Sequence, residues 1–236
     1  MRSRNVVVSS IVVLVMSVLA NGNVLSDGFE SGGFANWNAG WSGVAGSVVT
    51  SADGGTLLPR SGNYMMQSGD DPYGGNGSSL ANTFGEVLVG KTFTGYMTRA
   101  NELSQTPQMA CIGVSASSGN HVSVRADELG NVKVYYGYTA VDTGLVLPAH
   151  EWLKVSIYAG TEGMQVYIND TLYALPGSGN DYWVYGNDIS KVWAGSYWGM
   201  ESEWYYDDFV VTPEPASMVL MGFGAFLLRK RYAAVK

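Results

Sequence analysis

Glu201 and Glu203 are the two residues whose type and spacing come closest to those of a catalytic pair. They lie two positions apart, so on a β-strand both side chains would face the same side. Two carboxylates on one surface could act as general acid and general base in the cleavage of a glycosidic bond. Exposed glutamates are common, however, so the simpler interpretation is a solvated pair beside a strand.

Few other residues could support catalysis. His121 and His150 are the only histidines and Cys111 is the only cysteine, which makes a zinc site a poor interpretation. The G-x-S-x-G element of serine hydrolases is missing from the sequence. A single cysteine also excludes an intrachain disulfide, so the folded state must depend on a packed core and on any metal that it binds.

Charge is distributed unevenly along the chain. Residues 21–213 contain seven of the 13 basic residues and 19 of the 20 acidic residues, which gives this body a net charge near −12. Such a body repels the phosphate backbone, so we expect no nucleic acid partner. The other basic residues lie at the two ends of the chain, each group beside an apolar run.

The N-terminal end has the order of a secretory signal peptide. Arg2 and Arg4 precede an apolar run over Val6–Leu19, and Val18 and Ala20 occupy the two positions that a signal peptidase inspects. We therefore predict a signal peptide over residues 1–20, with signal peptidase cleaving after Ala20.

The C-terminal end, residues 212–236, combines an extended strip, an apolar run and a basic stop. Pro213 and Pro215 flank Glu214 and disfavour a helix there, which leaves a strip that a processing enzyme can grip. A helix over the 13 residues 216–228 would cover roughly 20 Å, short of the roughly 30 Å hydrocarbon core. The basic residues after it would stop transfer at the cytoplasmic face.

This tail resembles the PEP-CTERM sorting signal of bacteria that possess an exosortase. The resemblance implies export, retention in the membrane through a short transmembrane segment, and later processing near the Pro-Glu-Pro element by the exosortase. It places the protein in the cell envelope or on the extracellular surface, and it implies no activity for the rest of the chain. The residues that carry it are Pro213, Glu214, Pro215, Arg229, Lys230 and Arg231.

Between the two ends, short segments of alternating apolar and polar residues recur between Gly, Asn and Asp turns. Regular short strands of this kind are typical of an all-β antiparallel sandwich. The predicted strands are Ser47–Ser51, Tyr64–Gln67, Lys91–Arg99, Met109–Ala116, His121–Ala126, Val132–Tyr138, Leu153–Tyr158, Met164–Ile168, Lys191–Tyr197 and Tyr205–Val211.

The segment from Trp152 to Asp170 predicts a hairpin within this sandwich. Apolar residues at 153, 155 and 157 alternate with polar residues at 154 and 156, and Gly160 and Gly163 precede the next strand. The segment resembles the paired strands of laminin-G-like and concanavalin-A-like jelly rolls, in which a Trp-led strand, a glycine turn and a strand ending in an Asn turn follow one another. The resemblance implies a jelly roll.

The two ends of the predicted domain contain carboxylates. Residues 27–32 read D-G-F-E-S-G and residues 204–211 read W-Y-Y-D-D-F-V-V. This pattern is similar to exported jelly rolls and carbohydrate-binding modules in which the first and last strands lie side by side. In several such families an opening Glu and a closing Asp bind a structural calcium ion, which implies that Glu30, Asp207 and Asp208 could do so here. The alternative is that the aspartates are edge charges that deter aggregation.

Aromatic residues are concentrated late in the chain, with nine of them between residues 182 and 206. Aromatic faces stack on sugar rings, and their polar rims form hydrogen bonds. Some must fill the core, and we assign Trp193, Trp204 and Phe209 to it. We expect four others to be exposed and to bind carbohydrate, namely Tyr182, Trp183, Tyr185 and Trp198.

The sequence thus predicts a signal peptide at 1–20, a jelly-roll domain at 21–211 and a sorting signal at 212–236. The expected function is non-catalytic binding of a polysaccharide. One alternative is a glycoside hydrolase of the concanavalin-like sandwich type, although Glu201 and Glu203 lack the Glu-x-Asp-x-x-Glu arrangement of the sandwich glucanases. The other is a purely structural protein of the envelope or matrix.

Overall fold

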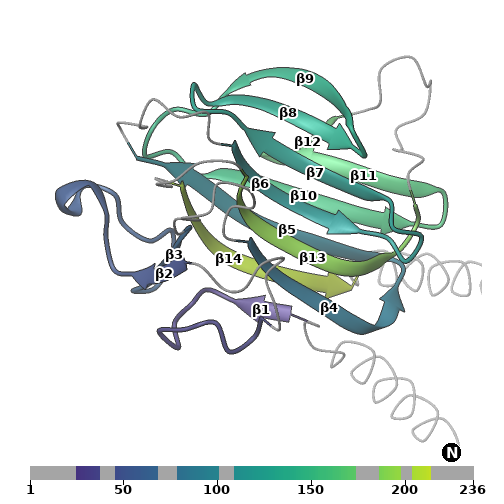
Figure 1. The fold of residues 1–236 in the computed structure, drawn as a ribbon, viewed down its shortest axis with the longest axis horizontal. Coiled ribbons are helices and arrows are strands. Elements are labelled where there is room, and N and C mark those ends of the chain that lie inside the picture. The colour runs from purple at the N-terminus through teal and green to yellow at the C-terminus, as the bar shows by residue number, and fades with distance from the viewer. Residues whose placement is uncertain are drawn as a thin grey trace, which may run out of the picture.

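The structure is a computed structural model that describes residues 25–37, 46–68, 79–100, 109–173, 186–197 and 204–213. Within these residues the chain forms two antiparallel β-sheets packed as a sandwich, plus one turn of 3-10 helix, η1 (Asp53–Gly55) (Figure 1). The predicted all-β sandwich is therefore confirmed. The predicted signal peptide and hydrophobic tail lie outside the described residues, so the domain boundaries stay predictions.

Sheet A has eight strands, and β14 is the strand on which its two halves meet. One side of β14 pairs with β5, and the other side pairs with β3 and β1. In spatial order the sheet consists of β12 (Thr171–Tyr173), β11 (Gly163–Ile168), β10 (Leu153–Gly160), β5 (Lys91–Arg99), β14 (Trp204–Pro213), β3 (Met65–Ser68) and β2 (Gly46–Val49), with β1 (Leu25–Asp27) beside β14.

Sheet B has six strands, and its central strands connect in sequence as a meander from β6 to β9. Its spatial order is β4 (Ser79–Leu88), β13 (Ile189–Tyr197), β6 (Met109–Ser115), β7 (His121–Ala126), β8 (Asn131–Tyr136) and β9 (Thr139–Val146).

Every strand predicted from alternation overlaps an observed strand, and two of them, β5 and β7, have the predicted bounds. The strands that the sequence pattern missed are β1, β4, β9 and β12. Glycine and a bulge interrupt β4, whose register against β13 shifts near Ile189. The β9 strand lies at the edge of sheet B and alternates only between exposed and half-buried positions, so its apolar pattern is weak.

The core fills the space between the sheets with the inward residues of both. Its aromatic centre is Phe209, which stacks on Phe93 with ring centroids 5.8 Å apart and meets the edges of Phe29 and Trp37. Phe209 is 1% exposed and Trp204 is fully buried, as predicted. Each large apolar side chain buried in this way contributes about 1.5–3 kcal/mol to folding.

The hairpin predicted from Trp152 to Asp170 is present as β10 and β11. Residues at 153, 155 and 157 of β10 face the core, whereas Lys154 is half-buried on the other face. After β11, Asn169 and Asp170 have φ angles of 48° and 65° and connect it directly to β12. Left-handed angles at both central residues are what a two-residue hairpin turn requires.

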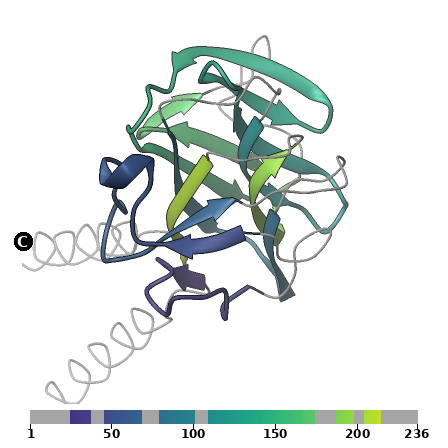
Figure 2. The ribbon, with the colours of Figure 1, turned by 60° about the vertical axis from the view of Figure 1, so that its left-hand side comes forward.

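The first and last described strands lie side by side, as the sequence resemblance implied. Leu25 pairs with Val211 and Asp27 pairs with Phe209, in an antiparallel register (Figure 2). The pairing closes sheet A beside the segment that connects β2 and β3. It also places Glu30 and the Asp207–Asp208 pair on the same side of the molecule.

Candidate functional site

The four aromatic residues predicted to bind carbohydrate lie outside the described residues, as do Glu201 and Glu203. In the sequence they flank β13, since residues 182–185 precede it and residue 198 follows it. Of the predicted sorting residues only Pro213, the last residue of β14, is described. The calcium ligands predicted from the sequence, Glu30, Asp207 and Asp208, all lie within the described residues.

Asp207 is fully buried, and its carboxylate accepts hydrogen bonds from backbone amides. Oδ2 accepts from the N–H groups of Arg60 at 2.9 Å and Ser61 at 3.2 Å, and Oδ1 accepts from the N–H of Asp208 at 2.7 Å. The donors at 60 and 61 lie about 147 residues away in the chain. Asp207 therefore holds the β2–β3 connection against the last strand.

Asp208 occupies a β-bulge and points to the surface. Its φ is 50°, and the register of β14 against β5 shifts by one residue between Asp207 and Val210. A bulge of this kind re-aims a side chain that regular alternation would send elsewhere. The Asp208 carboxylate accepts from Ser61 Oγ at 2.6 Å and forms an ion pair with Arg60.

Glu30 is bound to the same connection but at different residues. Its carboxylate accepts from the backbone N–H groups of Asn63 at 3.0 Å and Tyr64 at 3.1 Å. Gly62 has a φ of 64°, and a Cβ at that position would collide with the Glu30 carboxylate. Two independent features therefore require glycine at position 62, namely its positive φ angle and the close approach of the Glu30 carboxylate.

The environment of Asp207 raises the pKa of its carboxyl group from 3.8 to about 7. Burial is the main cause, and the neighbouring Asp208 carboxylate adds to it, while the amide donors act in the opposite direction. Near neutral pH the buried carboxyl group therefore carries a proton part of the time.

The three predicted calcium ligands do not converge on one point. Glu30 is occupied by donors at 63 and 64, whereas Asp207 and Asp208 are occupied by donors at 60 and 61. In the part of the chain that the structure describes, no three Asp, Glu, His or Cys residues are grouped to hold a metal ion. The pair Asp207–Asp208 alone falls short of the six to eight oxygens that calcium takes, so calcium binding stays a prediction.

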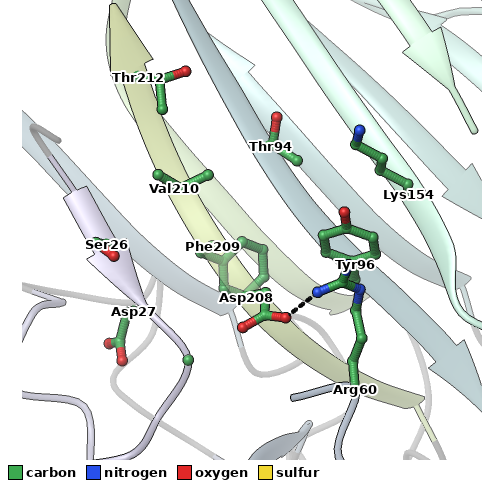
Figure 3. A pocket seen from close by; sticks show the side chains of 11 residues that line it. Ser26, Asp27, Arg60, Thr94, Tyr96, Lys154, Asp208, Phe209, Val210 and Thr212 are labelled. Carbon is green, nitrogen blue, oxygen red and sulfur yellow. Dashed lines mark hydrogen bonds and ion pairs between the residues drawn. The ribbon is translucent and has the colours of Figure 1, made fainter. Parts of the chain in front are cut away.

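A hollow of about 420 Å³ lies next to this cluster on the outward face of sheet A (Figure 3). Arg60 stacks over the Tyr96 ring at 3.6 Å, and Lys154 extends from β10 on the other side. Both cations already have a carboxylate partner, Arg60 with Asp208 and Lys154 with Asp170. The residues that line the hollow are Ser26, Asp27, Gly28, Arg60, Thr94, Tyr96, Lys154, Asp208, Phe209, Val210 and Thr212.

The outward face of sheet B is built differently, around a row of four residues on neighbouring strands. The register places Trp193, Gly113, Ser123 and Tyr135 opposite one another on β13, β6, β7 and β8. A Cβ at 113 would lie 2.5 Å from Cζ2 of Trp193, so the indole packs against the glycine. The prediction that Trp193 is buried is confirmed at 5% exposure, but it packs with Ala81 and Cys111 rather than in the main core.

Polar and aromatic side chains extend this row. The His121 ring meets Trp193 at 6.5 Å and the fully exposed Tyr138 at 6.2 Å, both edge-on. The Arg125 guanidinium lies 4.1 Å above the ring of Tyr135. Burial, and to a lesser degree the charge of Arg125, lowers the pKa of His121 below 6.5, so its ring is neutral at neutral pH. We did not predict these residues, although their alternation along β7 and β8 marks them as outward-facing.

Carboxylates are missing from the four strands that carry this row. The sequences of β13, β6, β7 and β8 contain no Asp or Glu, whereas they contain Lys191, Arg125 and Lys133. Cys111, also on this face, is buried, and burial raises the pKa of its thiol to about 12. A thiol of that kind is not a nucleophile at neutral pH. The arrangement can stack and donate hydrogen bonds, and the neighbouring edge strand β9 adds one exposed carboxylate, Asp142, in register with Lys133.

The sequence contains one match to a phosphate-binding loop that was not predicted. Gly85, Gly90, Lys91 and Thr92 have the G-x-x-x-x-G-K-T spacing of phosphate-binding loops. In the structure this segment is the end of β4, a tight turn and the start of β5. A phosphate-binding loop must lead into a helix, whose N-terminus faces the anion, so the match is accidental.

The C-terminal part of the chain matches a protein-family model. Residues 211–231 match the PEP-CTERM protein-sorting motif. The motif indicates export and membrane-associated sorting, and its first residues, 211–213, belong to β14. A search of the described residues for a helix long and apolar enough to cross a membrane found none. No curated protein sequence matches the chain.

Solved structures with a similar fold include a β-glucanase, a laminarinase catalytic domain and a calreticulin globular domain. The Bacillus licheniformis β-glucanase is 9% identical, with a TM-score of 0.51, covering 82% of this chain and 99% of that one. The laminarinase catalytic domain of Thermotoga maritima is 11% identical, with a TM-score of 0.51 and coverages of 81% and 98%. The T. cruzi calreticulin globular domain is 8% identical, with a TM-score of 0.50 and coverages of 90% and 97%. At these identities the likeness establishes the concanavalin A-like jelly-roll fold alone.

Proposed function

We propose that this exported, membrane-sorted protein is a non-catalytic jelly roll that binds a polysaccharide on the outward face of sheet B. An exosortase would process the tail near Pro213, Glu214 and Pro215, and the folded domain would present its ligand face in the envelope or matrix. The proposal extends what the sorting motif indicates, export and membrane association, to a molecular activity.

The observation that carries the proposal is the row from Trp193 to Tyr135 across four strands. Gly113 and Ser123 are small, so the indole of Trp193 packs closely against the sheet and is almost wholly buried. The accessible rings beside it are those of half-buried Tyr135 and exposed Tyr138. Flat aromatic surface with polar rims is what the apolar face of a sugar ring stacks on.

Donors for sugar hydroxyl groups surround these rings. The side chains of Arg125, Lys133 and His121 alternate outward on β7 and β8, each half-buried. The four aromatic residues predicted to bind carbohydrate flank β13 in the sequence and lie outside the described residues. A few fixed polar groups around aromatic rings are typical of small-ligand sites.

Glycoside hydrolysis is the weaker hypothesis for this chain. A hydrolase needs two carboxyl groups on opposite sides of the scissile bond. The four strands of the row contain none, and the carboxylate in register beside them is the single exposed Asp142 on β9, opposite Lys133. In the Asp207–Asp208 pair one member is fully buried beneath amide donors and out of reach of a substrate. Glu201 and Glu203 stay candidates for such a pair from the sequence, and the experiment below includes them.

The test is polysaccharide binding by the purified full-length protein in detergent, first on a glycan array and then by calorimetry on the best ligand. Tyr135→Ala should weaken binding about tenfold, the equivalent of roughly 1.4 kcal/mol. Tyr96→Ala, the matched tyrosine on the outward face of sheet A, should leave the affinity unchanged. A loss of affinity in Tyr96→Ala but not in Tyr135→Ala would instead place the binding site in the hollow of sheet A.

Two outcomes would replace the proposal. Release of reducing ends from a polysaccharide, abolished by Glu201→Gln or Glu203→Gln, would make the protein a glycoside hydrolase. Absence of both binding and hydrolysis across the array would leave a structural role in the envelope or matrix as the better account.

A further inference from the structure

Three elements meet at the end of the sandwich from which the sorting tail departs. Pro213, the last residue of β14, pairs with Lys91, the first residue of β5. The turn before Lys91 joins β4 to β5, and the N–H of its Gly90 donates to the carbonyl oxygen of Ala159 on β10 at 2.7 Å. The turn is therefore fixed beside the point where the tail leaves the domain.

Two valines, one near the end of β4 and one in the turn, are exposed. Val87 is 52% exposed and Val89 is 45% exposed, while Leu88 between them is 3% exposed and belongs to the core. Residues two apart on an extended chain point the same way, so both valines point away from the core together. They form a small apolar surface that no described strand covers.

The sequence of the tail limits how far this surface can be from a membrane. The matched sorting motif begins at residue 211 inside β14, and its apolar run begins at Val219. Six steps between consecutive Cα atoms separate Pro213 from Val219, which span at most about 22 Å when fully extended. While the apolar run is in the bilayer, Pro213 and its neighbours must lie within that distance of the hydrocarbon.

We infer that Val87 and Val89 form a lipid-contacting surface by which the folded domain rests on the bilayer that holds its tail. The contact is apolar rather than electrostatic. Lys91 is half-buried, and the exposed acids Glu86 and Glu162 lie near the end of β4 and on the β10–β11 turn. Anionic lipid is therefore not required, and the contact should form on a zwitterionic membrane.

The opposite end of the sandwich supplies a matched control. Leu129 is 67% exposed, in the turn between β7 and β8, and Arg99 at the far end of β5 donates to the carbonyl oxygen of the adjacent Glu128. The eight residue steps of β5 from Lys91 to Arg99 correspond to about 26 Å. Leu129 is as apolar and as accessible as the two valines, but it lies at the end remote from the tail.

The experiment uses the full-length chain reconstituted in phosphatidylcholine vesicles. Val89→Cys and Leu129→Cys are each labelled with an environment-sensitive fluorophore, since the native Cys111 is buried and its thiol has a pKa of about 12, which protects it from the reagent. Quenching by lipids that carry a nitroxide on the acyl chain is then measured at each position. We expect at least twofold stronger quenching at position 89 than at position 129.

Each other outcome overturns the inference in a recognisable way. Equal quenching at positions 89 and 129 in vesicles that carry the protein would mean that the domain does not rest on this end. Stronger quenching only when anionic lipid is added would replace the apolar contact with an electrostatic one. Failure of the chain to float with the vesicles would overturn the membrane contact of the tail together with this surface.

Discussion

The two outward faces of this sandwich differ in how their polar groups are used. On sheet A the carboxylates of Glu30, Asp207 and Asp208 accept bonds from one short connection, residues 60–64, and the nearby cations are ion-paired. On sheet B the central strands contain no carboxylate, and the indole of Trp193 packs against Gly113. One face uses its polar groups internally, and the other leaves them directed outward.

The difference follows from the position of the chain ends. Sheet A contains both β1 and β14, so it must be closed by pairing residues that are distant in sequence. Buried carboxylates that accept backbone amides close it at a cost, because desolvation raises the pKa of Asp207. Sheet B combines a meander from β6 to β9 with the pairing of β13 to β4 and β6, and buried Asp188 accepts the amide of Ser117 there.

Substitution of Gly62 should have the largest effect on the sheet A face and none on the sheet B face. Gly62→Ala should lower the free energy of unfolding by about 3 kcal/mol, because alanine is strained at a φ of 64° and its Cβ would displace Glu30 from its amide donors. Gly54→Ala is the control, since its φ is 65° but no atom lies within 4 Å of its Cβ.

Chemical denaturation measures both variants, and Gly54→Ala should lose only about 1 kcal/mol. Equal losses would mean that the Glu30 contact contributes nothing to stability. A loss of polysaccharide binding in Gly62→Ala would contradict the independence of the two faces.

Stability should rise as the pH falls from 8 to 5, through Asp207. Its folded pKa of about 7 lies above the unfolded value of 3.8, so between these pH values the folded state binds a proton that the unfolded state does not. The free energy of unfolding should therefore increase by roughly 2–3 kcal/mol on acidification. Asp207→Asn, which keeps an acceptor for the amides at 60 and 61, should remove this increase.

The difference between wild type and Asp207→Asn, measured by denaturation at each pH, isolates this group from others. His121 acts in the opposite direction, since its lowered pKa destabilises the folded state below pH 6.5. Parallel pH profiles for the two proteins would contradict the raised pKa of Asp207.

Much of the fold was predictable because alternation is a local signal. The core positions of β5, β7, β10 and β14 alternate with outward residues, and their strands were found with correct or nearly correct bounds. The signal fails where a bulge or glycine interrupts it, as at Gly85 in β4, and where both faces of an edge strand are exposed, as in β9. In these strands tertiary pairing, rather than local pattern, fixes the structure.

The site was less predictable because it depends on pairings that span most of the chain. The carboxylates Asp207 and Asp208 were identified from the sequence, but their partners Arg60 and Ser61 were not. Nothing local marks residues 60 and 61, since their role arises only when β3 docks on β14. On sheet B the row from Trp193 to Tyr135 requires the register of four strands, which the sequence pattern does not supply.

Substitution of Gly113 should act on the sheet B face in the way that Gly62 acts on sheet A, but with a smaller cost. Gly113→Ala would place its Cβ 2.5 Å from the indole of Trp193 and 2.8 Å from Cβ of Ser123, so the ring must tilt off the sheet. We expect a loss of about 1–2 kcal/mol in stability and a several-fold loss of polysaccharide affinity.

Gly85→Ala in β4 is the matched control, because no atom lies within 4 Å of its Cβ. It should change neither quantity, as measured by denaturation and calorimetry. Full affinity in Gly113→Ala would mean that the packing of Trp193 against Gly113 does not help to form the ligand surface.

The smallest expected effect is that of calcium, and it tests whether the closure of sheet A can also hold a cation. A divalent cation reduces the repulsion between two adjacent carboxylates only when both are ionised. The pKa of Asp207 is raised to about 7, so both are ionised only above that pH. Calcium should therefore raise the Tm by roughly 1–2 °C at pH 8, the equivalent of about 0.5 kcal/mol, and have no effect at pH 5.5.

Thermal unfolding in millimolar calcium, compared with EDTA and with magnesium, measures this effect, and Asp208→Asn should abolish it. Magnesium requires a compact octahedral set of ligands, which Asp207 and Asp208 alone do not provide, so it should not substitute for calcium. An identical Tm in calcium and EDTA at pH 8 would assign Asp207 and Asp208 to amide and arginine binding only. That result would sharpen the contrast between the faces, since the carboxylates of sheet A would then serve closure of the sandwich and nothing else.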